Sequence, residues 1–299
     1  MAAHRSPILA TLALLLVATL AGCSGSKPYE SKPWTGGPDS GEVLISPRFA
    51  VYSTLRDQGQ KQAVIETLER SLVRYDQLAP LPEPDASRRE AYVFGFREEW
   101  ADHTRQTQGP RAALYLNIDR GGFADAGKFS TFFSGSVASM LATVRHEGFH
   151  QHLALGFKRR PPPFLEEGLA TLFEQGFENG DVTKPRSNFR RLNELREGVR
   201  RQRTWPLSRL LTMHAGHVVG ANDHRQVGTF YAQAWALACF VVSDPKYREK
   251  TPDLMAAYAA GRASSDPRLA FARNYGVSFE QIAADYELFV YEMIRTDAD

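Results

Sequence analysis

The sequence contains little that would support a disulfide-stapled or a nucleic-acid-binding protein. Only two of its 299 residues are cysteines, Cys23 and Cys239, which excludes a disulfide framework and any zinc module built from several cysteines. Lys and Arg number 36 and Asp and Glu number 34, so the formal net charge is +2. Nucleic-acid-binding domains normally carry a marked basic excess. We therefore expect no nucleic-acid partner, and a zinc site would have to use His and Glu.

The N-terminus has the pattern of a secretion signal. Arg5 precedes an apolar run over residues 8–20, which is shorter than the ~20 residues that a helix needs to cross a bilayer. The run closes with Leu20-Ala21-Gly22-Cys23, which resembles the lipobox of bacterial lipoproteins. The resemblance implies that residues 1–22 are a signal peptide and that lipidated Cys23 anchors the chain in the bacterial cell envelope, at the outer membrane in a Gram-negative host. The alternative is an ordinary signal peptide that happens to end in Cys.

Two regions follow before the helical part of the chain. Residues 23–41 are rich in Ser, Gly, Pro and Lys, which predicts a flexible tether; Trp34 within it could dock on the folded domain. Residues 42–130 are predicted to form a small α/β subdomain. Its expected strands are 42–54 (a strand pair, or one strand with Pro47 at an edge), 91–96 and 112–118, with helices at 61–78 and around Trp100 and a glycine-rich turn at 119–127.

From residue 131 to 299 almost every segment has helical periodicity. The expected helices are 136–156, 164–178, 188–202, 206–214, 225–243, 252–261, 267–275 and 278–295. Cys239 lies in an apolar stretch of one of them and is expected to be a buried thiol. The sequence thus predicts an α+β fold, in which a sheet layer precedes a mostly helical subdomain.

The segment that carries chemistry is His146-Glu147-Gly148-Phe149-His150, an HExxH motif. Ser136 is a suitable N-cap, and Gly156 is expected to end the helix in the left-handed conformation. The motif should therefore lie in the middle of a helix, as metal binding requires. The alternative is a chance pair of histidines on a helix surface.

Helix geometry explains the spacing of the motif. At ~100° per residue, His150 lies one turn beyond His146 on nearly the same face, so both imidazoles can bind one Zn²⁺. Glu147 lies beside them, in a position for a general base acting on a water that zinc activates. His152 projects to the other side of the helix and is a poor ligand candidate.

A third ligand is expected from the segment after the motif. The prolines 161–163 separate two helices, so a helix hairpin can return Glu166 and Glu167 to the metal. Helical spacing leaves both glutamates open as the ligand, and a solvated helix N-terminus is a further alternative for both of them.

The combination of HExxH, a proline, an apolar pair and E-G-x-A resembles the gluzincins, the metallopeptidases related to thermolysin and to zinc aminopeptidases. The closest likeness is to the peptidase-MA-like families of bacterial envelope proteins. This resemblance implies a zincin-like domain with the HExxH helix at its junction with the sheet. It also implies that Glu167, which precedes Gly-x-Ala, is the third zinc ligand.

The resemblance gives expectations for two further positions. Thermolysin-like enzymes have an aspartate four residues after the ligand glutamate that supports a zinc-binding histidine, whereas Thr171 stands here and its hydroxyl is a weaker partner. Gluzincins often supply a Tyr or His from a later helix to the oxyanion, which makes Tyr231 the candidate, with His217 and His224 as weaker ones. The alternative for Tyr231 is a packing role, because it shares an apolar stripe with Trp235.

The Arg-rich segment 184–203 is interpreted as a solvated amphipathic helix. Phe189, Leu192 and Val199 mark its expected inner face. The alternative is a binding site for an acidic partner.

We therefore predict a membrane-anchored zinc metallopeptidase that hydrolyses bonds of a peptide or protein substrate. An extended substrate is expected to add to an edge of the sheet. The alternatives are a non-catalytic envelope binding or scaffold protein that retains the zincin fold, and a zinc hydrolase of non-peptide bonds. The predicted site comprises Glu147 as general base, Tyr231 as oxyanion donor, and His146, His150 and Glu167 as ligands of Zn²⁺.

Overall fold

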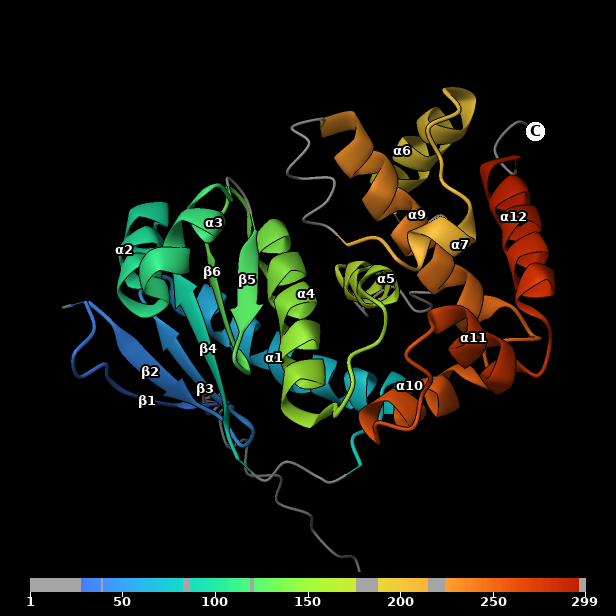
Figure 1. Cartoon of the computed structure of the whole chain (residues 1–299). Coiled ribbons are helices and arrows are strands. Elements are labelled where there is room, and N and C mark those ends of the chain that lie inside the picture. The colour runs from blue at the N-terminus through green and yellow to red at the C-terminus, as the bar shows by residue number, and fades with distance from the viewer. Residues whose placement is uncertain are drawn as a thin grey trace, which may run out of the picture.

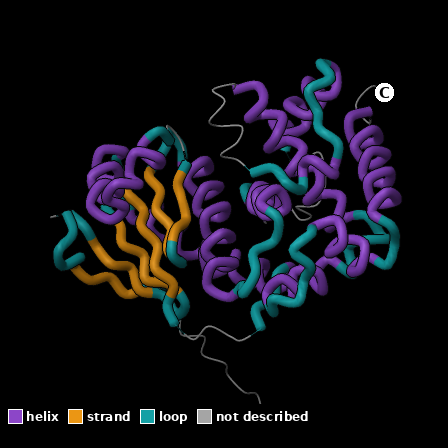
Figure 2. The backbone as a smooth tube through the Cα atoms, in the orientation of Figure 1, coloured by secondary structure: helices purple, strands orange, loops and turns teal. Residues whose placement is uncertain are grey.

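The computed structural model describes residues 28–38, 40–82, 87–118, 121–175, 188–214 and 224–295. The fold is α+β, with a six-stranded sheet at one side of the molecule and a group of helices at the other (Figure 1; Figure 2). The predicted signal peptide and Cys23 lie outside the described residues. Among the helices that the structure describes, none combines the length and the apolar character needed to span a membrane.

The sheet is mixed, with the strand order β1-β2-β3-β4-β6-β5. The strands are β1 (Glu30–Pro33), β2 (Glu42–Ile45), β3 (Phe49–Ser53), β4 (Arg89–Phe94), β5 (Gly122–Asp125) and β6 (Lys128–Phe132). β3, β4 and β6 pair in parallel, whereas β1, β2 and β5 join by antiparallel pairing. β5 is therefore an edge strand.

Helices cover both faces of the sheet. On one face, α1 (Gln58–Leu78) and α4 (Val137–Gly156) pack on the apolar side chains of the strands, and the buried residues Val64, Leu68 and Tyr75 follow the helical period of α1. On the other face lie α2 (Arg97–Gln108), the 3-10 turn η1 (Gly109–Arg111) and α3 (Ala112–Leu116). There Trp100 is fully buried in a smaller aromatic cluster with strand residues. One side of α4 thus packs on the sheet, and the opposite side of α4 faces the helical group.

The helical group contains α5 (Pro163–Phe173), α6 (Phe189–Arg200), α7 (Leu207–Leu210), α9 (His224–Ser243), α10 (Thr251–Ala259), α11 (Pro267–Tyr275) and α12 (Phe279–Arg295). In Figure 1, α5 is seen almost end-on between α4 and α9, and it packs against both of them. Cys239 is fully buried in α9, as predicted. The expected helices from residue 136 onward are confirmed, although α5 ends at Phe173 and α7 is only a single turn.

The prediction for residues 112–127 is wrong. The expected strand 112–118 is mostly the helix α3, and the expected turn contains the strand β5, which pairs with β6. Ala126 and Gly127 both have positive φ and connect the two strands as a two-residue turn. Tyr115 stacks on Phe123 at 4.0 Å between ring centroids, so its apolar ring packs on the sheet from a helix.

The prediction of a flexible tether over residues 23–41 is wrong for its second half. Residues 30–33 form β1 and pair with β2. Trp34 docks on the domain, with its ring centroid 5.2 Å from that of Tyr52 and 5.9 Å from that of Tyr92. The fold of the sheet therefore includes residues that composition alone assigned to a linker.

Candidate metal centre

The two histidines of the motif lie on α4, which begins where the sequence predicted. The hydroxyl of Ser136 accepts a hydrogen bond from the backbone N–H of Ser139 at 3.1 Å and caps the helix. The helix continues through Gly156 without the predicted left-handed residue, and its C-cap is Phe157. A Cβ at Gly156 would lie 2.4 Å from a methyl of Leu81, so this glycine serves close packing instead.

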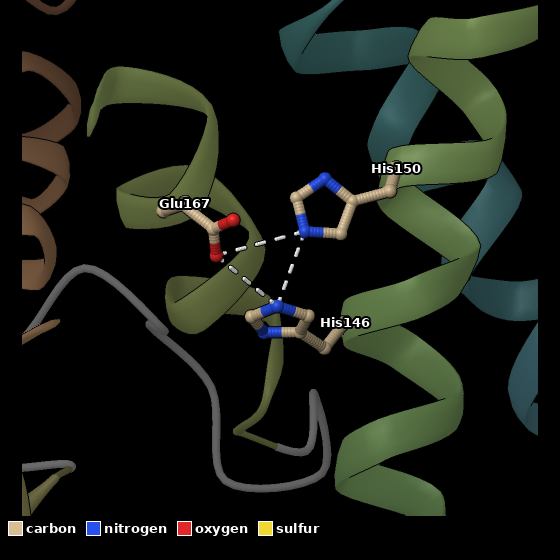
Figure 3. A group of neighbouring side chains, drawn as sticks. All are labelled: His146, His150 and Glu167. Carbon is tan, nitrogen blue, oxygen red and sulfur yellow. Dashed lines mark hydrogen bonds and ion pairs between the residues drawn. The ribbon is translucent and has the colours of Figure 1, made fainter. Parts of the chain in front are cut away.

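The side chains of His146 and His150 point from α4 toward α5 (Figure 3). Their Nε2 atoms are 3.2 Å apart. Oε2 of Glu167, on α5, lies 3.5 Å from Nε2 of His146 and 3.7 Å from Nε2 of His150. One ligand atom from each of these residues thus meets the others within 4.8 Å, as a metal site requires.

The other ring nitrogen of each histidine is held by a second glutamate. Nδ1 of His146 lies 3.1 Å from Oε1 of Glu174, just beyond the end of α5. Nδ1 of His150 lies 2.7 Å from Oε1 of Glu166, whose carboxylate also pairs with Arg160. Glu166 therefore orients a histidine, while its neighbour Glu167 faces the point where the ligand atoms meet.

The donor and acceptor roles in these hydrogen bonds indicate whether the two histidines and Glu167 are suited to hold a metal ion. A carboxylate is an acceptor, so each Nδ1 is the donor and each Nε2 of the neutral ring presents a lone pair. Oε2 of Glu167 is buried and has no hydrogen-bond partner among the described residues. With both rings neutral, three electron-rich atoms thus converge without a donor between them, which is unfavourable unless a proton or a metal cation occupies the space. The donor set therefore fits a divalent cation.

The pKa values of the histidines reflect the same excess of negative charge. Burial alone would lower the pKa of His146, but the carboxylates of Glu167 and Glu174 outweigh it and raise the pKa to about 9. For His150 burial is likewise outweighed, by Glu167 and Glu166, and the pKa rises well above its usual value. Without a metal, protons compensate the carboxylates; a metal would displace those protons on binding.

Glu147 lies between the two histidines and the edge strand β5. A Cβ at Gly122 of that strand would lie 3.1 Å from Cγ of Glu147, so the glycine leaves room for this side chain. Burial raises the pKa of Glu147, against the opposing effect of the two histidines. A carboxylate with a raised pKa is a better proton acceptor near neutral pH, which suits a general base.

Tyr231 lies on α9, which packs closely against α5. Gly168 permits this, because a Cβ there would lie 2.1 Å from the backbone oxygen of Ala234 and would push α9 away from α5. The negative charge of Glu167, and then burial, raise the pKa of the Tyr231 phenol well above its usual value. Tyr231 therefore stays protonated and keeps a hydrogen-bond donor within the electrostatic influence of Glu167.

The structure thus brings together the three residues His146, His150 and Glu167 that the sequence predicted as ligands. The hydroxyl of Thr171 is buried and has no hydrogen-bond partner among the described residues, so it supports neither histidine. Glu174, one turn later on the same side of α5, takes that role. His217 lies outside the described residues, as does the side chain of His224.

Sequence reasoning missed three residues around the centre: Glu174, Arg160 and Arg191. Glu174 had a usable signal, since a residue seven positions after Glu167 returns to the same helix face. For Arg191 the prediction of a solvated helix face is wrong. Arg191 is buried while Phe189, predicted to face inward, is 63% exposed; residues 184–187 of that segment lie outside the described residues.

Residues 140–262, which cover less than half of the chain, match a family described as "Protein of unknown function (DUF1570)". The matched region runs from α4 to just beyond α10, so it includes every residue of the metal centre. A search of curated proteins found no match.

Proposed function

We propose that this protein is a membrane-anchored zinc metallopeptidase of the gluzincin type, with a zincin-like fold around the α4–α5 pair. The observation that carries the proposal is the convergence of the two Nε2 atoms and Oε2 of Glu167, with a carboxylate on the far side of each imidazole. Zinc-binding histidines commonly donate their second N–H to such a carboxylate, which fixes the ring and strengthens the ligand.

The spacing of the ligand atoms is compatible with a tetrahedral zinc ion. Ligands about 2.0–2.2 Å from a tetrahedral zinc ion lie about 3.3–3.6 Å from one another. The three distances here are 3.2, 3.5 and 3.7 Å. Three protein ligands leave a fourth position open, which is the pattern of a catalytic rather than a structural zinc site.

The residues around the site can be assigned steps of peptide hydrolysis. Zinc, when bound, supplies a Lewis acid that activates water and polarises the substrate carbonyl. Glu147 accepts the proton of the attacking water and passes it to the leaving amine. Tyr231 donates a hydrogen bond to the oxyanion that develops on the substrate. An extended peptide would pair with the edge strand β5, which lies beside Glu147.

The proposed location follows from the lipobox-like sequence that ends at Cys23. Lipidation of that cysteine would tether the catalytic part to the cell envelope, since acyl chains contribute about 0.8 kcal/mol per buried CH₂. Labelling cells with a radioactive fatty acid would test this step, because Cys23→Ser should remove the label.

A single comparison tests the catalytic proposal. The chain from residue 24 onward is purified, its zinc content is measured by mass spectrometry, and cleavage of a peptide library is profiled for the wild type and for Glu147→Gln. We expect equal zinc in both proteins and a loss of cleavage of about 10²–10⁴-fold in the variant, the usual contribution of a general base.

The other outcomes discriminate between the alternatives. Zinc without any cleavage that depends on Glu147 would support a scaffold protein, or a hydrolase of non-peptide bonds if such a substrate is turned over. A protein that binds no zinc when the metal is supplied would overturn the assignment of the whole site.

A further inference from the structure

We infer that Arg191 is a positioning residue that couples the metal-binding His146 to the hydrogen-bond donor Tyr231. This inference deepens the proposed function and rests on it. Among the described residues, the Arg191 side chain contacts Glu174, Glu194 and the ring of Tyr231 but none of the three ligand atoms, so it would act through the side chains that it touches.

The first link runs from Arg191 to the metal. Nη2 of Arg191 lies 3.6 Å from Oε1 of Glu174, and the same oxygen is the partner of Nδ1 of His146 at 3.1 Å. The positive guanidinium attracts the carboxylate of Glu174 and limits its movement. That carboxylate in turn holds the ring of His146 with Nε2 turned toward Glu167.

The second link runs from Arg191 to Tyr231. The guanidinium carbon lies 5.2 Å from the centre of the Tyr231 ring, which is cation–π contact distance. A planar cation on one side of the ring limits how far the phenol can turn. The same side chain therefore fixes both the histidine and the tyrosine.

Arg191 is itself held firmly enough to act in this way. Only 8% of its side chain is exposed, and Nη1 donates to the carboxylate of Glu194 at 3.0 Å. Its backbone N–H donates to Asn188, which caps α6. Arginine is rarely buried to this extent unless it is paired. Arg191 therefore occupies a defined position between Glu174 and Tyr231.

Arg160 provides a matched control within the same site. It pairs with Glu166, which holds His150, just as Arg191 approaches Glu174, which holds His146. Arg160 is 39% exposed, and no aromatic ring in the described part of the chain lies under its guanidinium. The two arginines thus share the link to a histidine, but only Arg191 has the link to Tyr231.

The test compares Arg191→Met, Arg191→Lys and Arg160→Met in the chain from residue 24. Zinc affinity is measured by competition with a chelator, and kcat and KM are measured at saturating zinc on a peptide that the wild type cleaves. We expect zinc affinity to fall about 10–100-fold in both methionine variants, the usual effect of losing a residue behind a ligand. Only Arg191→Met should also lower kcat, by about tenfold or more, with KM nearly unchanged.

The lysine variant separates charge from stacking. Lysine keeps the positive charge near Glu174 but lacks the flat guanidinium that covers the tyrosine ring. Zinc affinity should therefore return to nearly the wild-type value in Arg191→Lys, while kcat stays low. This variant also serves if Arg191→Met does not fold.

A readout that needs no peptide substrate keeps the inference separate from the proposed function. In protein labelled with ¹³C-tyrosine, the ring signal of Tyr231, assigned with Tyr231→Phe, should shift in Arg191→Lys and not in Arg160→Met. If the wild type binds zinc but cleaves nothing, the proposed function fails, and the zinc affinities and this signal still decide the role of Arg191. Unchanged zinc affinity in Arg191→Met, or an unmoved Tyr231 signal, would overturn the inference.

Discussion

His150 and His152 lie on opposite faces of helix α4, and their pKa values are shifted in opposite directions. His150 faces α5 and is surrounded by carboxylates, which raise its pKa well above the usual value. His152 faces α1, where burial, assisted by the positive charge of Arg89, lowers its pKa to about 4. The same residue type on the same helix is thus a candidate ligand on one face and a neutral structural residue on the other.

The cause of the difference is the kind of group that each ring meets. His152 lies with Nε2 2.7 Å from the backbone oxygen of Ala79 and Nδ1 3.2 Å from Nη1 of Arg89, so it donates at one nitrogen and accepts at the other. That pattern satisfies the neutral ring completely. The rings of the other face donate from Nδ1 and leave Nε2 facing electron-rich atoms. The suitability of a histidine as a metal ligand therefore depends on its partners more than on its burial.

Among the tests of this difference between the two faces of α4, removing the Glu167 carboxylate on the α5 side should have the largest effect. Glu167→Gln should weaken zinc binding about 100-fold or more, because zinc sites with four ligands gain roughly 10–16 kcal/mol, or about 3 kcal/mol per ligand. Cleavage should disappear with the metal. Glu166→Gln, measured by the same chelator competition, should weaken zinc binding by only about 10–30-fold. A larger loss in Glu166→Gln than in Glu167→Gln would make Glu166 the ligand.

An intermediate effect concerns the α1 side and its dependence on pH. His152→Leu should lower the free energy of unfolding at pH 7 by about 2–3 kcal/mol, because the partners of two buried hydrogen bonds are left behind. Since the folded-state pKa of His152 is about 4 and lies below its ordinary value of 6.5, its contribution is present above pH 6.5 and is lost as the pH falls toward 4. Urea unfolding of the metal-free protein should therefore show the gap between wild type and variant closing over that range.

His146→Leu is the contrasting variant for the same measurement. The folded-state pKa of His146 is about 9, so its contribution to the stability of the metal-free protein is complete below pH 6.5 and is lost as the pH rises through 9. The gap between wild type and this variant should thus narrow in alkali, where that of His152→Leu stays open. Gaps that followed the same pH trend would contradict the assignment of the two faces.

The smallest expected effect sharpens the contrast between Thr171 and Glu174. Thr171→Val replaces a buried hydroxyl that has no partner among the described residues, so stability should stay unchanged or rise by up to about 1 kcal/mol. Zinc affinity should also stay unchanged, whereas Glu174→Gln should lower it about 10–100-fold. Thermal unfolding and chelator competition measure both quantities, and a marked loss of zinc in Thr171→Val would return the supporting role to this position.

The sequence was sufficient for the elements whose pattern repeats over several turns. The helical period over residues 136–156 and the cap at Ser136 located α4, and the E-G-x-A resemblance implied the candidate ligand that α5 brings to it. The strand and helix of residues 112–125 could not be assigned in this way. A five-residue apolar run has too few periods to separate a helix from a strand, and β5 is defined by its pairing with β6.

The supporting groups of the site were predicted least well, for a related reason. A charged residue on the polar side of a helix produces the same sequence pattern whether it faces solvent or a group of opposite charge in the protein. Arg191 fits the pattern of a solvated helix, and only the docking of α6 beside α9 shows that its guanidinium is enclosed. Periodicity describes one element at a time, whereas the pairing of Arg191 with Glu174 depends on how two elements pack.

The close approach of α5 and α9 depends on the absence of a side chain at Gly168. Any other residue at position 168 would carry a Cβ that meets the backbone of Ala234, so the two helices would have to separate. Glu167 and Tyr231 would then keep their chemical groups and lose their spacing. The absence of a side chain at position 168 thus sets the distance between α5 and α9, and a substitution there would disrupt the proposed site with every functional group still present.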